Sequence, residues 1–340
     1  MPPPSGAYIG RLAPAPTGSL HIGNARTFLL AWLRARQAGG RILLRLEDLD
    51  HPKVKAGAAG ELYQDLAWLG LDWDAGPAQA LAASHPGSLP AVPDPYVQSE
   101  NLARYREALE QLYRQGKIYP CVCRRQELQL FQSAPHSEAE QREYRYPGHC
   151  RGRFPDLAAA RAERSDGKVA WRFRLDSAEL TCFQDAFAGY QESRLDAWSG
   201  DFLVGRETEA GYQLAVVVDD HQMGISEVVR GDDLLPSTHR QLVIYRALGF
   251  SPPRFCHFPL ILGPDGRRLA KRHGDSRLSR LREKGVKPER LLGWLAWCSG
   301  WNQDWRREVS LAELVATADF SRLPPQPVVV DKNQLAELGF

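Results

Sequence analysis

Residues that could bind phosphate gather in one short stretch near the start of the chain, APAPTGSLHIGNART, which begins at Ala13. The stretch combines two prolines, two glycines, hydroxyl side chains and a histidine directly ahead of an apolar run that begins at Phe28. A turn between two elements needs only one or two such residues, so the excess indicates a ligand site. Gly18 and Gly23 would let a ligand approach the backbone, and His21 could donate a hydrogen bond.

The chemistry expected there is phosphate binding at a helix N-terminus, where unpaired N–H groups and the positive end of the helix dipole favour anions. The side chains of Thr17, Ser19 and Asn24 could add further donors. The spacing matches neither the P-loop nor the G-x-G-x-x-G fingerprint. His21 by itself also fits a histidine that caps a turn, so the stretch alone leaves nucleotide binding a hypothesis.

A second candidate site is the basic stretch from Pro264 to Arg290, in which ten Lys or Arg residues face four Asp or Glu residues. Lys271 stands among several glycines in this stretch, so its loop could close over a ligand. Phosphate contact is one interpretation of the charge. A solvated helical face is the other, and charge alone favours it.

Three cysteines form a third candidate site. Cys121 and Cys123 stand one residue apart, and Cys150 follows after a gap of 26 residues. Three thiolates need a fourth ligand to complete tetrahedral zinc. Chemistry alone nominates His149 or His136, because a phenol with a pKa near ~10 is a reluctant ligand. The alternative is that these are plain buried or surface cysteines.

The candidate residues need elements to position them. Residues 7–12 are predicted to form a buried strand, residues 22–37 a helix and residues 41–50 a second strand. A strand, a loop, a helix and a strand make a βαβ unit, whose strands should be parallel. Ligands of such sheets bind at the carboxyl ends of the strands, which is where the first stretch lies.

The remaining pattern predicts one loop, one helix, three strands and a helical end. In chain order these are the loop 75–95, the helix 100–118, the strands 169–176, 211–220 and 225–235, and helical residues from 277 onward. The fold class predicted from this order is α/β. A cysteine-bearing insertion interrupts the α/β domain, and a small helical piece follows it.

Composition is ordinary for a soluble globular protein, with 43% hydrophobic and 25% charged residues among 340. No apolar run is long enough for a membrane span, and the N-terminus has none of the features of a signal peptide. Six cysteines are too few for a disulfide scaffold of this size, so a cytoplasmic protein is expected. The net charge of +2 does not by itself indicate a nucleic-acid partner, and nothing in the sequence demands an oligomer, so we expect a monomer.

Several motifs, in order along the chain, resemble class I aminoacyl-tRNA synthetases. Residues 14–24 resemble the HIGH signature, and RRLAKRHG around Lys271 resembles the KMSKS loop. Between them, RLEDLD with Glu47 and VVRGDDLL with Arg230 resemble the glutamate-specific branch. The resemblance implies a Rossmann-type catalytic domain in which a carboxylate attacks the α-phosphate of ATP, accompanied by Mg²⁺. Negative charge then builds on oxygens, so donors and cations should dominate catalysis.

The resemblance also implies roles for individual residues. His21 and Lys271 would be catalytic, with His21 at the ATP phosphates and Lys271 stabilising charge at the α-phosphate and the leaving group. The implied ATP site consists of Pro14, Thr17, Gly18, His21, Gly23, Asn24, Arg268, Leu269 and Lys271. The implied glutamate site consists of Arg11, Ala13, Ala15, Glu47, Tyr212 and Arg230.

Within the implied glutamate site, Arg11 and Arg230 would bind carboxylates and Glu47 would bind the amino group. A forked guanidinium contact would favour glutamate over glutamine. The competing interpretation is that Arg11 and Glu47 simply form a structural ion pair. Tyr212 would supply a hydroxyl, whereas Ala15 stands where the branch usually carries Ser, which would remove a hydroxyl contact but not a backbone contact.

The zinc motif of the family is Cys-x-Cys followed by Tyr-x-x-x-Cys, and Tyr146 fits its tyrosine position. The ligand set implied for one structural Zn²⁺ is Cys121, Cys123, Tyr146 and Cys150. His149 is the reserve for the fourth ligand. The gap after Cys123 is longer than expected, so Tyr144 and His136 also stay open.

The end of the chain bears on the RNA substrate. Only about 67 residues follow His273, whereas full-length glutamyl-tRNA synthetases continue with helical domains that read the anticodon. This layout resembles the truncated paralogous family, the glutamyl-Q tRNA(Asp) synthetases. They activate glutamate without tRNA and place it on the queuosine at the wobble position of tRNA(Asp). The alternatives are a compact glutamyl-tRNA synthetase that charges tRNA(Glu) and an inactive RNA-binding paralogue.

The resemblance divides the chain into four parts. Residues 1–105 would form the first half of the Rossmann-type domain and residues 106–195 the zinc-bearing insertion. Residues 196–275 would form the second half with the lysine loop. Residues 276–340 would resemble the region that contacts the tRNA stem, without an anticodon-binding domain.

Overall fold

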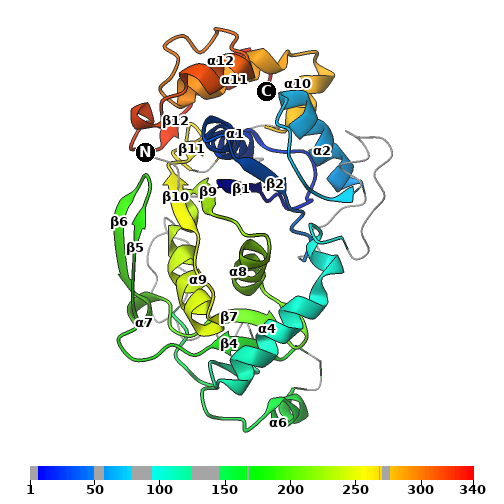
Figure 1. The fold of residues 1–340 in the computed structure, drawn as a ribbon, viewed down its shortest axis with the longest axis vertical. Coiled ribbons are helices and arrows are strands. Elements are labelled where there is room, and N and C mark those ends of the chain that lie inside the picture. Colours follow the sequence, from blue (N-terminus) through cyan, green and yellow to red (C-terminus); the bar gives the residue numbers. More distant parts are fainter. Residues whose placement is uncertain are drawn as a thin grey trace.

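The computed structural model describes residues 7–49, 57–78, 94–124, 145–164, 166, 168–267, 269 and 276–340. Figure 1 shows a larger lobe built on the central strands and a smaller lobe beneath it, next to helix α4 (Leu102–Arg114). None of the described helices is long and apolar enough to cross a membrane.

The chain begins with the predicted βαβ unit, formed by β1 (Ile9–Leu12), α1 (Ile22–Gln37) and β2 (Arg41–Leu44). The two strands pair in parallel, which confirms the prediction. The helix ends before Gly39, whose φ of 62° lies in the left-handed region that favours glycine. The loop between β1 and α1 begins at the carboxyl end of β1, as the sequence predicted.

Further strands extend this arrangement. The backbone N–H of Ser226 donates to the carbonyl of Ile9 at 2.9 Å, so the strand that follows Ser226 begins beside β1. The next strands, in spatial order, are β9 (Glu227–Gly231), β10 (Arg254–Phe258), β5 (Leu180–Asp185) and β6 (Gly189–Arg194). β9, β10 and β5 are parallel and β6 is antiparallel at the edge. The parallel strands agree with the α/β fold expected from the sequence, which did not predict the antiparallel edge strand β6.

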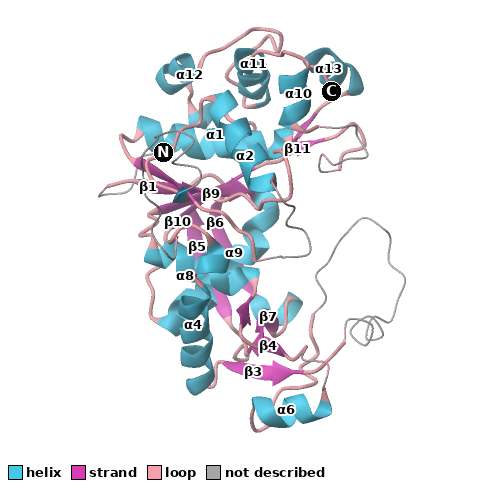
Figure 2. Ribbon diagram, turned by 90° about the vertical axis from the view of Figure 1, so that its right-hand side faces the viewer, coloured by secondary structure: helices cyan, strands magenta, loops and turns pink. Residues whose placement is uncertain are grey.

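Successive side chains of a strand point to opposite faces of the sheet, and each face packs against its own hydrophobic core. Leu43 and Val228 are buried in the core below the central strands, whereas Leu44 and Val229 are buried in the core above them. Figure 2 shows the corresponding layers. The helices α1, α2 (Ala58–Leu69) and those of the C-terminal region lie above the central strands, and α8 (Tyr212–Gln222) and α9 (Leu235–Leu248) lie below them. A sheet covered on both faces explains why two consecutive apolar residues of one strand can both be buried.

One sequence prediction is wrong in this region. Residues 211–220 were expected to form a strand, but Tyr212–Gln222 is a helix, α8. Every side chain from Leu214 to Asp220 is buried. The reason is that α8 packs between α4, α9 (Leu235–Leu248) and strand β7 (Phe202–Arg206) of the smaller lobe. A helix buried on all sides has no polar face, so its sequence looks like a buried strand.

The smaller lobe contains an antiparallel sheet. Its strands, in spatial order, are β3 (Ile118–Cys121), β4 (Ala170–Phe173), β7 (Phe202–Arg206) and β8 (Glu209–Ala210). The lobe's helices are α4 (Leu102–Arg114), α6 (Leu157–Glu163) and α7 (Leu195–Trp198). The part predicted as residues 106–195 contains strands of both sheets, because β3 and β4 belong to this sheet whereas β5 and β6 belong to the sheet of β10. The other two strands of this sheet, β7 and β8, lie beyond residue 195.

The C-terminal region is helical, as expected from residue 277 onward. It contains α10 (Leu278–Glu283), α11 (Pro288–Cys298), α12 (Leu311–Thr317) and α13 (Lys332–Leu338). A strand that the sequence analysis missed, β12 (Val328–Val329), pairs in parallel with β11 (Ile261–Leu262). The buried guanidinium of Arg26 in α1 donates to the carbonyl of Cys298 at the end of α11, which ties this region to the βαβ unit.

Candidate active site

A cavity of about 350 Å³ opens at the carboxyl ends of β1 and β9, beside the N-terminus of α1. Eleven of the residues proposed for the ATP and glutamate sites line it: Arg11, Ala13, Pro14, Ala15, His21, Gly23, Asn24, Glu47, Tyr212, Arg230 and Leu269. The sequence analysis missed other lining residues, among them Thr27, Phe28, Asp233, Leu234 and Leu260. Residues from five separate stretches of sequence therefore meet in one cavity.

Two of the proposed ATP-binding residues, Thr17 and Gly18, are not among the residues that line this cavity. The adjoining loop donors are directed to α2 instead. The backbone N–H of Ser19 donates to Glu61 at 3.0 Å, and the hydroxyl of Ser19 donates to Asp65 at 2.6 Å. The middle of the loop is thus held to α2 at Ser19, whereas residues 13–15 before it and His21 after it line the cavity.

Leu269 and Ser276, which lie on either side of Lys271 in the sequence, are both placed at the cavity or at this loop. Lys271 and Arg268 lie outside the described residues, but Leu269 is buried and lines the cavity. Downstream, Oγ of Ser276 lies 3.2 Å from Nδ1 of His21, and the backbone N–H of Ile22 donates to the carbonyl of Ser276 at 3.0 Å. Ser276, five residues after Lys271 in the sequence, therefore lies at the histidine of the first motif.

Buried charges surround the cavity. Arg45 is fully buried and donates to Asp220 at 2.6 Å and to Glu47 at 2.9 Å. Arg11 shares the carboxylate of Asp220 with Arg45, because its Nε lies 3.4 Å from the same oxygen. Arg11 and Glu47 therefore do not form the simple structural pair that was the competing interpretation. Burial raises the pKa of Glu47 above its ordinary value, against the opposing effect of Arg45.

Arg230 is held on two of its three nitrogens. Its Nε donates to Nε2 of His257 at 3.0 Å, and its Nη2 donates to Thr238 at 2.7 Å and to Gln241 at 2.8 Å. Its Nη1 is buried and has no hydrogen-bond partner among the described residues, and the same is true of Nε of Arg11. Arg230 can therefore offer a ligand only Nη1, and not the two nitrogens that a forked contact requires.

This arrangement suits a small zwitterion with more than one carboxylate. Two guanidinium groups, those of Arg11 and Arg230, line the cavity together with two carboxylates, those of Glu47 and Asp233. An anionic group placed between Arg11 and Arg230 would satisfy both, while Glu47 could accept hydrogen bonds from an ammonium. The hydroxyl of Tyr245, which the sequence analysis also missed, is buried nearby without a hydrogen-bond partner among the described residues.

The proposed metal-binding cysteines meet in the smaller lobe. The sulfurs of Cys121, Cys123 and Cys150 all lie within 4.8 Å of one another. The hydroxyl oxygen of Tyr146 lies 3.4 Å from the sulfurs of Cys121 and Cys123, and it accepts the backbone N–H of Cys150 at 2.9 Å. Three sulfurs and one phenol oxygen that converge in this way form a donor set of the right number for a tetrahedral metal.

A buried cation accompanies this cluster. Nε of Arg172 donates to the sulfur of Cys121 at 3.2 Å, and its guanidinium lies 3.6 Å from the centre of the Tyr146 ring. Hydrogen bonds from Cys123 and Cys150 lower the pKa of the Cys121 thiol, and Arg172 adds to the effect. Cys121 therefore favours the thiolate, which is the form of cysteine that binds metals, whereas the hydrogen bond with Cys121 raises the pKa of the Cys123 thiol.

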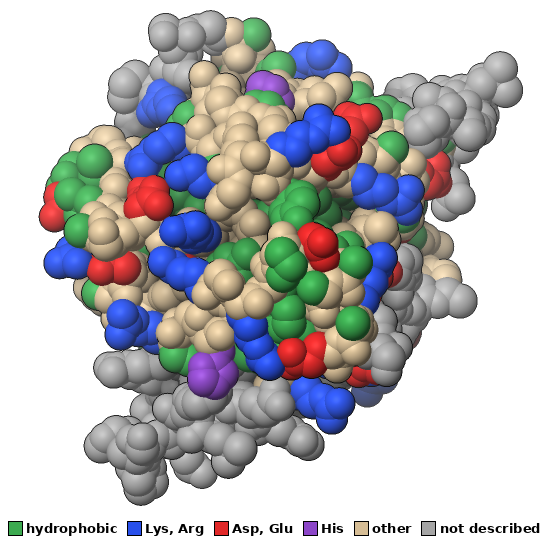
Figure 3. All heavy atoms as spheres, turned by 90° about the horizontal axis from the view of Figure 1, so that it is seen from below, with side chains coloured by type: hydrophobic (Ala, Val, Ile, Leu, Met, Phe, Trp, Pro, Cys, Tyr) green, Lys and Arg blue, Asp and Glu red, His purple; other side chains and the backbone are tan. Residues whose placement is uncertain are grey.

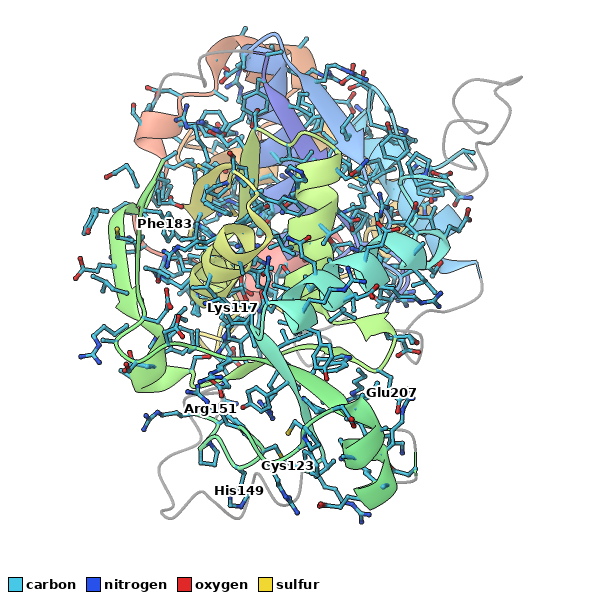
Figure 4. All side chains as sticks on the ribbon, turned by 60° about the horizontal axis from the view of Figure 1, so that its bottom comes forward. Lys117, Cys123, His149, Arg151, Phe183 and Glu207 are labelled. Atoms are coloured by element: carbon cyan, nitrogen blue, oxygen red, sulfur yellow. The ribbon has the colours of Figure 1, made fainter. Side chains whose placement is uncertain are left out.

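The alternative fourth ligands differ in position. His149 is exposed and does not belong to the three-cysteine cluster. Figure 4 shows both Cys123 and His149 at the lower end of the molecule. Tyr144 and His136 lie outside the described residues. Of the four candidates, Tyr146 alone is buried among the sulfurs in the described part of the chain.

Figure 3 shows the lower face of the molecule, where Lys and Arg side chains are interspersed with Asp and Glu. Several arginines of the smaller lobe are paired with carboxylates. Arg153 pairs with Glu163 at 2.7 Å, and Arg161 pairs with Glu207 at 2.8 Å. The charge of this face is therefore mixed rather than uniformly basic, and it does not by itself mark an RNA-binding surface.

Comparison with known proteins gives a consistent result. The family described as tRNA synthetases class I (E and Q), catalytic domain, matches residues 9–337. The chain is 46% identical over 332 residues to the glutamyl-Q tRNA(Asp) synthetase of Symbiobacterium thermophilum, an alignment that covers 97% of this chain and 98% of that protein. It is 41% identical to the protein of the same name from Rhodopirellula baltica, over 95% of this chain and 96% of that one.

Longer relatives match over only part of their length. Glutamate–tRNA ligase 2 of Syntrophus aciditrophicus is 40% identical over 96% of this chain but only 64% of its own length. Among solved structures, a glutamate tRNA ligase from Elizabethkingia meningosepticum in complex with its amino acid has a TM-score of 0.77 at 25% identity, covering 98% of this chain and 69% of that one. The fold is therefore shared with both groups of relatives.

Proposed function

The chain belongs to the class I tRNA synthetases of glutamate and glutamine, and from that premise we propose that it activates L-glutamate with ATP and transfers the glutamyl group to the queuosine at the wobble position of tRNA(Asp). Three relatives named glutamyl-Q tRNA(Asp) synthetase support this proposal, because they are similar over 96% to 98% of their own lengths.

The observation that carries the amino-acid assignment is the pair of guanidinium groups, those of Arg11 and Arg230, that line the cavity. Nη1 of Arg230 is buried without a hydrogen-bond partner among the described residues, and Nε of Arg11, which makes no hydrogen bond there either, lies 3.4 Å from Asp220. Buried polar groups without partners are costly, so such donors indicate a ligand that supplies acceptors. A dicarboxylic amino acid supplies them, and Glu47 accepts its ammonium group.

In the first reaction a carboxylate oxygen of glutamate attacks the α-phosphorus of ATP, and the bond to the pyrophosphate oxygen breaks. Negative charge grows on the phosphate oxygens, so His21 and the N-terminus of α1 stabilise it by hydrogen bonds and by the helix dipole. Lys271 adds a positive charge at the α-phosphate and the leaving group, and Mg²⁺ bound with ATP supplies further charge neutralisation. In the second reaction an acceptor group of the nucleoside attacks the carbonyl carbon of glutamyl-adenylate, and AMP leaves.

The cysteine cluster has a separate, structural role in this proposal. Cys121, Cys123, Cys150 and Tyr146 hold one Zn²⁺, which supplies no catalytic chemistry. Cys121 ends β3, whereas Tyr146 and Cys150 follow residues 125–144. A metal bound by both segments joins them across that stretch, and the closed four-ligand set leaves no open position for a substrate.

The experiment that tests the proposal is glutamate-dependent exchange between ATP and pyrophosphate, with protein freed of RNA by nuclease. Glutamine and aspartate serve as controls. We expect exchange with glutamate alone and without added tRNA. Exchange that requires tRNA(Glu) would instead indicate a compact glutamyl-tRNA synthetase, and absence of exchange under both conditions would contradict the proposed activity.

A further inference from the structure

A buried carboxylate and a buried histidine lie behind Arg230. Oδ1 of Asp185, the last residue of β5, accepts backbone N–H groups from Phe187 at 2.9 Å, Ala188 at 2.8 Å and His257 at 3.1 Å. Oδ2 of the same carboxylate lies 2.6 Å from Nδ1 of His257. Both side chains are inaccessible to solvent, and their strands β5 and β10 are neighbours in the sheet (Figure 1).

These contacts determine where the proton of His257 lies. Burial opposes ionisation of Asp185, but the hydrogen bonds from His257 and the backbone outweigh it and hold its pKa below the ordinary value. An ionised carboxylate only accepts hydrogen bonds, so Nδ1 of His257 must carry a proton. Burial lowers the pKa of His257 to about 4, which keeps the ring neutral near pH 7. Nε2 is then an acceptor.

The acceptor nitrogen of His257 faces the Nε–H group of Arg230 at 3.0 Å. Two more N–H groups of Arg230, both on Nη2, are held by Thr238 and Gln241. Gln241 is itself held, because its amide donates to Gln213 at 3.1 Å. Three of the five donors of the guanidinium are thereby fixed by side chains that do not line the cavity, and the two donors on Nη1 remain for a ligand.

We propose that Asp185 and His257 are positioning residues that hold the guanidinium of Arg230 so that Nη1 meets a carboxylate of the amino-acid substrate. This inference rests on the proposed function, in which Arg230 binds a carboxylate of glutamate. Neither residue touches the substrate, and both act through Arg230.

The order of the groups has an electrostatic consequence. The hydrogen-bond partners of Arg230 in the described part of the chain are all neutral side chains. Asp185 would neutralise the guanidinium if it bound Arg230 directly, but the imidazole of His257 stands between the two charges. Arg230 is thus held firmly while its positive charge stays available to an anionic ligand.

The test compares variants in glutamate-dependent ATP–pyrophosphate exchange. In Asp185→Asn the new amide can donate to Nδ1 of His257, which moves the ring proton to Nε2. The Nε2–H group then faces the Nε–H group of Arg230, and two donors cannot form a hydrogen bond. We expect the KM for glutamate to rise on the order of 10- to 100-fold, because small misplacement of a binding group has costs of this size. The KM for ATP should change less than about twofold, since Arg230 contacts only the amino acid in this scheme.

Variants of the histidine separate positioning from general damage. His257→Gln retains an acceptor that can reach the Nε–H group of Arg230, whereas His257→Phe has none, so the Gln variant should keep a lower KM for glutamate. The matched control is Asp201→Asn. Asp201 is equally buried and accepts from Tyr119 and from the backbone of Leu175, but it lies in the smaller lobe. The Asp201→Asn protein should be less stable than the wild type but should have an unchanged KM for glutamate.

Two further measurements complete the test. In an Arg230→Lys background, Asp185→Asn should add no further increase in the KM for glutamate, because the contact it disturbs is already gone. In ¹⁵N NMR spectra of the wild type, the His257 ring should show a protonated Nδ1 and an unprotonated Nε2, and Asp185→Asn should change this pattern. The NMR readout does not depend on activity.

The outcomes distinguish the two proposals. An unchanged KM for glutamate in Asp185→Asn, equal rises in the KM for both substrates, or a wild-type ring protonated at Nε2 would each overturn the positioning role. A wild-type protein that shows no glutamate-dependent exchange would overturn the proposed function itself.

Discussion

Nη2 of Arg45 lies 2.9 Å from Oε1 of Glu47, two residues further along the chain. Alternate residues of an extended segment share a face, so the pair continues the line of β2 toward the cavity. Arg45 is fully buried, whereas the side chain of Glu47 keeps 15% of its surface exposed. The arginine therefore anchors the carboxylate from behind and leaves it open to a ligand on the other side.

This relationship predicts an effect of pH on glutamate activation. Burial raises the pKa of Glu47 above its ordinary value of 4.5, so the carboxylate becomes protonated at a higher pH than an exposed one. Protonated Glu47 cannot accept the charge-assisted hydrogen bonds of an ammonium. We expect kcat/KM for glutamate to fall on the acid side at a pH above 4.5, and the pH profile of the exchange reaction measures it.

The same residue predicts a separation of activity from stability. A carboxyl group whose pKa is raised by folding stabilises the protein fully at a pH below its unfolded pKa. This contribution is lost as the pH rises through the pKa of the folded state, so ionised Glu47 lowers the stability at pH 7. Glu47→Gln should therefore leave Tm unchanged or raise it. The KM for glutamate should rise roughly 10- to 100-fold, since a hydrogen bond to a charged group contributes about 1.5–3 kcal/mol. A lower Tm with an unchanged KM would contradict this role.

Gly23 predicts a steric test of the ATP site. It lies in the first turn of α1 and lines the cavity, and an added Cβ would meet no protein atom within 4 Å. Gly23→Ala should fold normally and gain up to about 1 kcal/mol of stability. The KM for ATP should rise about tenfold, because overpacking a filled site typically costs about 1–3 kcal/mol.

The matched control for this test is Gly60→Ala in α2. Gly60 also has open space around its Cβ position but does not line the cavity. The control should gain similar stability and leave both KM values unchanged. Equal kinetics in the two variants would show that Gly23 does not adjoin the nucleotide.

The cysteine cluster predicts a change in metal content. We expect the purified wild type to contain one equivalent of zinc by mass spectrometry, and Cys123→Ser to contain much less, because a thiolate ligand is lost. Cys182→Ser is the control, since Cys182 is exposed on β5, away from the cluster. Tyr146→Phe should bind zinc more weakly, and an unchanged zinc affinity would show that Tyr146 is not the fourth ligand.

His257 predicts how stability depends on pH. Its pKa is lowered from 6.5 to about 4, so the unfolded chain binds a proton there before the folded protein does. The stability that neutral His257 contributes is present above pH 6.5 and is lost as the pH falls toward 4, at about 1.4 kcal/mol per pH unit. Urea unfolding between pH 4.5 and 7 should show a shallower dependence in His257→Gln than in the wild type.

Much of the local structure could be predicted from the sequence. The helix over 22–37 has the predicted bounds, because His21, the apolar run that follows and Gly39 mark its beginning and end. Period and turn residues carry such information locally. The same rules failed for α8, since a helix buried on all sides has the apolar sequence of a buried strand.

The groups that support the candidate site could not be predicted in the same way. Asp185 and His257 are 72 residues apart, and Arg45 and Asp220 are 175 residues apart. No local pattern links such pairs, and each residue alone looks like an ordinary polar residue at the end of an apolar segment. Two adjacent acids, Asp219 and Asp220, could have indicated a functional site. Residues 211–220 were assigned to a strand instead of a helix, so the directions of these two side chains could not be predicted.

The central claim is tested most directly by transfer of radiolabelled glutamate to RNA. The acceptors are tRNA(Asp) with queuosine, the same tRNA without queuosine and tRNA(Glu), and nuclease digestion locates the label. The account predicts label on queuosine-containing tRNA(Asp) alone, within the anticodon fragment. Label at the 3′ end of tRNA(Glu), with none on tRNA(Asp), would contradict it.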